Sequence, residues 1–147
     1  MFSKEEALQI KKDFWIAFAA EYPRKWLLYQ TKIKDVTFKF YVDNKKAQVS
    51  LDIEPKDDEK RKIYYEKMVS LKTILEEEFI NDAIFEQHYY LENGKIISRV
   101  WVELNGISIN NRKSWLLIFD FFYEKMDAFE RFFYEHESYL KDLEMNT

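Results

Sequence analysis

Hydrophobic residues recur at helical spacing over the first 22 positions of the chain: Leu8, Ile10, Phe14, Trp15, Phe18 and Tyr22. Ser3, followed three positions later by Glu6, has the pattern of a capping box, in which the two residues satisfy each other's backbone N–H groups. Pro23 follows the run, and proline cannot continue a helix. The pattern predicts a helix over 4–22.

Two pairs of segments then alternate between apolar and polar residues, which is the period of a half-buried strand. The first pair covers 36–42 and 47–53, joined by an Asp-Asn-Lys-Lys turn. The second pair covers 84–91 and 95–104 around an Asn-Gly turn, and Asn-Gly tolerates the positive φ angles that tight hairpin turns need. The sequence therefore predicts two antiparallel hairpins.

Two further helices are predicted from apolar stripes at helical spacing. One runs over 58–80, where Asp57 and Asp58 place negative charge at its start. The other begins after Asn110 or Asn111 and continues through Leu143, about 32 residues without an internal breaker. The resulting order is α-ββ-α-ββ-α, an α+β fold in which two hairpins form one four-stranded antiparallel sheet with helices mainly on one face.

The two ββα halves share residues at matching positions, which suggests an internal duplication. At a constant offset of 49, four residues match four others: Tyr41, Asn44, Lys46 and Glu54 match Tyr90, Asn93, Lys95 and Glu103. At an offset of 58, the helix segment Tyr65-Glu66-Lys67-Met68 also matches Tyr123-Glu124-Lys125-Met126. Chance matching is the alternative, because turns favour Asn and helices favour Glu and Lys.

Composition narrows the class of protein. The 147 residues are 47% hydrophobic and 18% aromatic, which indicates one folded domain over 1–147 rather than a disordered chain. The absence of Cys excludes disulfides and thiolate chemistry and favours a reducing, cytoplasmic location.

No apolar run approaches the roughly 20 residues that a membrane helix needs, so we expect no membrane association. Only two Gly are present, and they do not form a phosphate-binding loop.

Several motifs together resemble a known bacterial family, a domain of unknown function. They are Phe14-Trp15 with Pro23, the hairpin strand Phe38-Lys39-Phe40-Tyr41-Val42, the run Asn110-Asn111-Arg112-Lys113 before Trp115, and the helix segment Phe122-Tyr123-Glu124-Lys125-Met126. Members of this family occur alone or C-terminal to restriction-nuclease-like modules. The resemblance implies an accessory role near nucleic acid and supplies no catalytic residue.

An acid-x-lysine triplet, Glu54-Pro55-Lys56, follows the second predicted strand, and Asp52 shares the strand face of Glu54. Restriction-type nucleases combine such a triplet with a further acid that binds Mg²⁺. The upstream acid of this hairpin, Asp43, lies about 30 Å from Glu54 at ~3.3 Å per residue, too far to share a metal. A metal-dependent nuclease-related enzyme using Asp52, Glu54 and Lys56 is therefore the alternative function, and we assign no catalytic residue, metal ligand or cofactor.

The sheet face opposite the helices is the better candidate for function. If that face is open to solvent, strand alternation places Lys39, Tyr41, Arg99 and Trp101 on it. Aromatic rings beside cations can stack on bases and meet phosphates, and a mixed aromatic and charged surface also suits a protein partner. The first hypothesis is thus a non-enzymatic binding or accessory module with a protein or nucleic-acid partner at this face.

Two further features suggest contact surfaces. The segment Pro23–Lys34 interleaves Trp26 and Tyr29 with four cations, and it either forms a lip beside the sheet or fills the end of the core. The final helix, near 48 Å long at ~1.5 Å per residue, exceeds the roughly 38 Å diameter of a domain of this size. An overhanging apolar stripe through Phe133 and Leu140 then predicts a homodimer through this helix.

Overall fold

The computed structural model describes residues 3–145 of the chain. It has a four-stranded antiparallel sheet in the order β1-β2-β4-β3, against which the helices pack. In chain order the elements are α1 (Lys4–Glu21), β1 (Val36–Val42), β2 (Lys46–Ile53), α2 (Asp58–Ser70), α3 (Lys72–Glu78), β3 (Ile84–Tyr90), β4 (Ile96–Asn105), α4 (Trp115–Glu135) and α5 (Glu137–Met145). The predicted α+β fold with two hairpins in one antiparallel sheet is confirmed.

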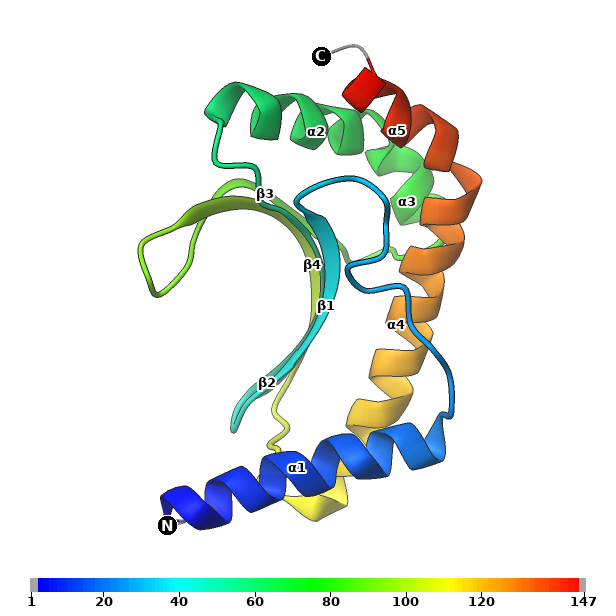
Figure 1. The fold of residues 1–147 in the computed structure, drawn as a ribbon. Coiled ribbons are helices and arrows are strands. Elements are labelled where there is room, and N and C mark those ends of the chain that lie inside the picture. The colour runs from blue at the N-terminus through cyan, green and yellow to red at the C-terminus, as the bar shows by residue number, and fades with distance from the viewer. Residues whose placement is uncertain (1–2, 146–147) are drawn as a thin grey trace.

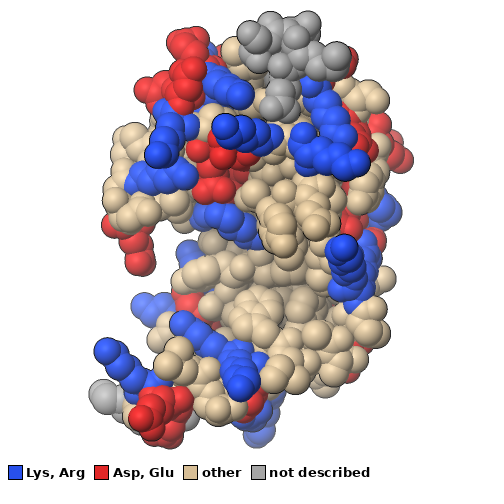
Figure 2. Space-filling model, viewed as in Figure 1, with Lys and Arg blue, Asp and Glu red and all other residues tan. Residues whose placement is uncertain are grey.

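The sheet is strongly curved. Figure 1 shows α4 along its convex side, with α1 and α2 at opposite ends of the strands, and Figure 2 shows that the surface on the other side is hollowed. The convex side buries the alternate residues of the central strands, among them Val49, Leu51, Val100 and Val102, against aromatic residues of α4. The core therefore lies between the convex side and α4, and the other side, here called the concave face, carries the remaining strand residues.

The hairpins place β1 and β3 at the two edges and β2 beside β4 at the centre. This order is compatible with two related ββα units, and the internal duplication stays a prediction. The structure describes no helix long and apolar enough to cross a membrane.

The prediction of a single helix over 58–80 is wrong. The helix is interrupted at Leu71, where the backbone N–H bonds to the Met68 carbonyl, three residues back. After this break α3 takes a new direction, in which Leu75 is fully buried and the ring of Phe79 meets that of Phe132 in α4. Packing against α4 thus overrides the continuous helical pattern.

The prediction of one unbroken C-terminal helix is also wrong. The helix ends at His136, and α5 turns over α2 (Figure 1), where the hydroxyl groups of Tyr139 and Ser70 are hydrogen-bonded. Phe133 and Leu140, expected on an overhanging stripe, are buried within the chain, because folding back removes them from water. The Leu143 side chain lies outside the described residues. The length argument for a dimer no longer holds, although self-association itself stays a prediction.

Candidate binding surface

The four residues predicted to bind a partner lie on the concave face, but they differ in exposure. Lys39 and Tyr41 lie on edge strand β1 and are exposed, whereas Arg99 and Trp101 lie on central strand β4. β2 separates the two pairs, and Trp101 keeps only 7% of its surface exposed. The expectation that this whole face is open to solvent is therefore wrong at its centre, because the curvature brings its side chains together.

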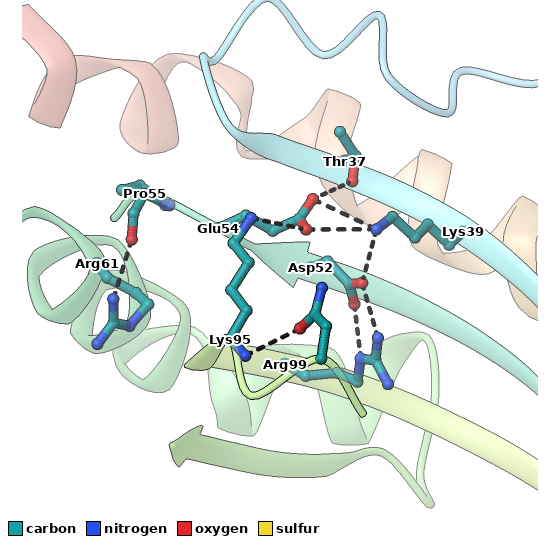
Figure 3. Close-up of polar contacts among 9 residues, drawn as sticks. Thr37, Lys39, Asp52, Glu54, Pro55, Arg61, Lys95 and Arg99 are labelled. Atoms are coloured by element: carbon teal, nitrogen blue, oxygen red, sulfur yellow. Dashed lines mark hydrogen bonds and ion pairs between the residues drawn. The ribbon is translucent and has the colours of Figure 1, made fainter. Parts of the chain in front are cut away.

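The centre of the concave face is an ion-pair network around Asp52 (Figure 3). Arg99 donates from Nε and Nη2 to the two carboxylate oxygens of Asp52, at 2.8 and 2.9 Å. Lys39 Nζ lies 3.3 Å from one of those oxygens, and the Asp52 side chain is 0% exposed. Burial lowers the pKa of Arg99, but the hydrogen bonds and charge of Asp52 outweigh burial and raise it. The guanidinium is thus held by Asp52 rather than presented to a ligand.

Trp101 is held in a similar way. Its Nε1 donates to Glu103 at 2.8 Å, and the amide of Gln48 donates to the same carboxylate oxygen at 3.0 Å. The ring of Tyr89 meets Trp101 edge-on at 5.3 Å and lies 4.3 Å from the Arg99 guanidinium carbon. Tyr89 therefore covers both residues, and neither the Trp101 ring nor the Arg99 guanidinium offers a free stacking surface.

The acids of the nuclease alternative are already paired with cations. Besides Asp52, Glu54 lies 3.4 Å from Lys39 Nζ and 3.6 Å from Lys95 Nζ. Within the part of the chain that the structure describes, no three His, Cys, Asp or Glu side chains are grouped so that they could hold a metal ion. The geometry gives the Asp52, Glu54 and Lys56 hypothesis no support beyond the sequence spacing.

A pocket of about 560 Å³ lies beside the outer edge of β1, and we call it the β1 groove. Its walls come from α1, the connection after it, β1 and the residue after β2: Trp15, Phe18, Ala19, Tyr22, Arg24, Trp26, Leu28, Tyr29, Thr37, Phe38, Lys39, Phe40 and Glu54. Rings dominate the lining, and the ring of Phe40 is 5.3 Å from Phe18 and 5.5 Å from Trp26. Figure 2 shows uncharged surface hollowed between charged groups above and below it.

Ion pairs with α4 hold the connecting segment in place. Arg24 pairs with Asp127 and Glu130, each at 2.8 Å, while its guanidinium carbon lies 4.2 Å from the centre of the Trp26 ring. The other Glu130 oxygen accepts from the backbone N–H of Leu27 at 2.7 Å. Both roles considered for this segment are observed: Trp26 and Leu28 pack against the core, and they also line the β1 groove.

Sequence reasoning missed the β1 groove as a site. The segment has no regular periodicity, and it turns at Leu28, Lys32 and Asp35, which have φ angles of 47°, 65° and 63°. Leu rarely adopts such a conformation, so no residue signalled the turn. The buried Thr31 hydroxyl fixes the segment by donating to the Val36 carbonyl at 2.7 Å.

Comparison with known proteins adds a family and no activity. The family model described as "Domain of unknown function (DUF4268)" matches residues 10–137. No curated protein and no solved structure matches the chain.

Proposed function

The chain belongs to this family of domains of unknown function, and since membership assigns no activity, we propose that the protein is a non-enzymatic binding module that takes a protein partner in the β1 groove. The single observation that carries the proposal is the aromatic pocket of about 560 Å³. Its volume lies within the roughly 300–1,000 Å³ of ordinary binding pockets.

The composition of the groove favours a protein partner over nucleic acid. Trp and Tyr are enriched where proteins bind one another, because they bury large areas with little loss of conformational freedom. The cations of the predicted surface, and Arg24 in the groove, are paired within the fold: Arg24 with two acids of α4, Arg99 with Asp52, and Lys39 with Asp52 and Glu54. A protein segment fills such a groove mainly with apolar side chains and needs only the half-exposed Lys39 as an additional charge contact, whereas a polyanion needs a row of free cations.

Lys39 links the β1 groove to the surface predicted from sequence. It lines the groove and also lies on the concave face, where its side chain is 45% exposed. We retain Lys39 and Tyr41 as partner-binding residues and give Arg99 and Trp101 the role of shaping the face. Bacterial origin, cytoplasmic location and association with nuclease-like modules stay predictions.

A matched pair of helix variants tests the proposal. Ala19 and Ala20 are neighbouring exposed residues of α1, and Ala19 lines the groove whereas Ala20 does not. Random dodecapeptides displayed on phage are selected on the immobilised full chain, and the recovered peptides are titrated against each variant. We expect Ala19→Gln to weaken binding by about tenfold or more, as for a residue at the centre of an interface, and Ala20→Gln to leave binding unchanged.

Two results would overturn the proposal. One is a selection that yields no peptide, or peptides that both variants bind as tightly as the wild type. The other is binding of a single-stranded oligonucleotide that weakens steeply with salt and in Lys39→Ala, which would assign the surface to nucleic acid instead.

A further inference from the structure

β1 is an edge strand, and the hydrogen-bonding pattern of its hairpin determines which backbone groups point away from the sheet. Asp43 N–H donates to the Lys46 carbonyl at one end, and Glu54 N–H donates to the Asp35 carbonyl at the other. Residues opposite each other in an antiparallel pair alternate between bonded and non-bonded positions. The register with β2 therefore directs the N–H and C=O groups of Val36, Phe38 and Phe40 outward.

The first half of this edge is covered by the chain itself. Val36 N–H donates to the Ile33 carbonyl, the Val36 carbonyl accepts from Thr31, and Phe38 N–H donates to the Leu28 carbonyl at 3.0 Å. No described residue bonds in this way to the Phe38 carbonyl or to the N–H and C=O of Phe40. These three backbone groups, like those of Val42 at the end of the strand, are thus left for a partner.

The β1 groove runs alongside these groups. Four consecutive residues, Thr37 to Phe40, all line it. Their side chains alternate between the two faces of the sheet, so a space that touches all four must lie beside the strand rather than above one face. The aromatic pocket and the open edge are one site.

We propose that the β1 groove takes an extended segment of the partner, which adds to the edge of β1 as a fifth strand. This inference rests on the proposed function and specifies its mode. Such strand addition obtains affinity from main-chain hydrogen bonds and specificity from pockets for alternate side chains. The Phe40 N–H and C=O bond to one residue of the segment, and the Phe38 carbonyl accepts from another.

The lining determines the chemistry of the segment. The residue opposite Phe40 points to the helix side, where Trp15, Phe18 and Trp26 receive an apolar or aromatic side chain. Its neighbours point to the concave side beside Lys39, and there an acid is favoured. Among the charged groups of the groove, the cations Lys39 and Arg24 are 45% and 30% exposed, whereas Glu54 is only 17% exposed. The ligand is therefore an extended segment in which acidic and apolar residues alternate.

The test uses a defined probe, the acetylated and amidated peptide Glu-Val-Glu-Phe-Glu-Val-Glu, with the full chain labelled with ¹⁵N. Hydrogen exchange at individual amides is measured by NMR with and without saturating peptide. We expect exchange of the Phe40 amide to slow by about tenfold or more, because its open N–H becomes bonded. The amides of Lys39 and Tyr41 point to β2 and serve as internal controls, already protected in the free protein.

Two control peptides test the pattern and the charge. One has the same composition without alternation, Glu-Glu-Glu-Glu-Val-Phe-Val, and the other replaces each Glu by Lys. We expect both to bind at least about fivefold more weakly than the probe, and Lys39→Gln to reduce the preference for Glu over Lys.

The outcomes separate this inference from the proposed function. If peptides from the phage selection bind and respond to Ala19→Gln while the Phe40 amide stays unprotected, the function stands and strand addition is wrong. If the probe does not bind, or binds no better than its controls, the alternating chemistry is wrong. If the Phe40 amide becomes protected with rising protein concentration and no peptide, the edge belongs to a second copy and the proposed occupant is overturned.

Discussion

Removing the carboxylate of Asp52 is the sharpest test of whether Arg99 serves the fold or a ligand. In Asp52→Leu the guanidinium of Arg99, whose side chain is 12% exposed, loses both of its short hydrogen bonds. Tyr89 above it limits the water that can replace them. The variant leaves a largely buried, unpaired cation, which is among the costlier defects a fold can carry.

Breaking a buried ion pair by removing one partner costs about 3–5 kcal/mol. Arg99 retains some contact with solvent, and Lys39 keeps Glu54 as a second partner, so we expect the low end, about 3 kcal/mol. That corresponds to a drop of about 6–12 °C in Tm for a domain of this size. Arg99→Met should cost at least as much, because it leaves the fully buried Asp52 with Lys39 alone.

The double variant Asp52→Leu with Arg99→Met removes both charges. Apolar residues of similar volume often replace a buried ion pair without loss, so we expect stability within about 1 kcal/mol of the wild type. Urea unfolding of the wild type and three variants, followed by circular dichroism, gives the full double-mutant cycle. A cost below about 1 kcal/mol for Asp52→Leu alone would contradict a structural role for Arg99, since it would show a solvated Arg99 free to leave Asp52 for a phosphate.

Three further predictions concern stability in acid, self-association and Mg²⁺-dependent cleavage. Burial raises the pKa of Asp127, but hydrogen bonds from Arg24 and Arg131 outweigh it and lower the pKa below the ordinary 3.8. The stability from these pairs is present above pH 3.8 and is lost as pH falls through the lowered value, so acid titration should destabilise the wild type more than Asp127→Asn. Self-association through the C-terminal helices would have to use exposed residues such as Tyr134; sedimentation equilibrium should then give twice 18.1 kDa, reduced in Tyr134→Asp, and a single wild-type species at 18.1 kDa rejects it. We expect no Mg²⁺-dependent DNA or RNA cleavage, because the acids are already paired with cations, and cleavage lost in Glu54→Gln would instead establish the enzyme.

The strands could be predicted closely because alternation is a local signal. The expected 36–42 is the observed β1, the bounds of β2 and β3 differ by one residue at one end, and those of β4 differ by one residue at both ends. A half-buried strand shows its period of two in the sequence whatever packs on it. The helix breaks at Leu71 and His136 carry no such signal. Neither break has Gly or Pro. Both arise because the helix that follows changes direction to pack on another helix, α3 on α4 and α5 on α2.

The candidate site was only half predictable for a related reason. Alternation correctly places Lys39, Tyr41, Arg99 and Trp101 on one face, but it contains no information on curvature. Curvature brings Tyr89 over Arg99 and Trp101 and leaves the edge residues exposed. The β1 groove depends on contacts between residues roughly a hundred positions apart, such as Arg24 with Asp127, which no local pattern encodes.

Those long-range contacts also explain why the edge is open. The segment that covers the start of β1 runs from Ile33 back to Leu28, and continued alongside the strand it would reach Phe40 next. Instead the chain turns at Leu28, and the Leu27 N–H donates to the Glu130 carboxylate on α4. An unpaired edge is a liability that proteins usually cover. Here a segment of turns between Leu28 and Asp35 covers the first half of β1 and leaves the strand at Leu28. A partner strand at Phe40 would therefore bond to the next backbone groups of an edge that the chain itself begins to pair.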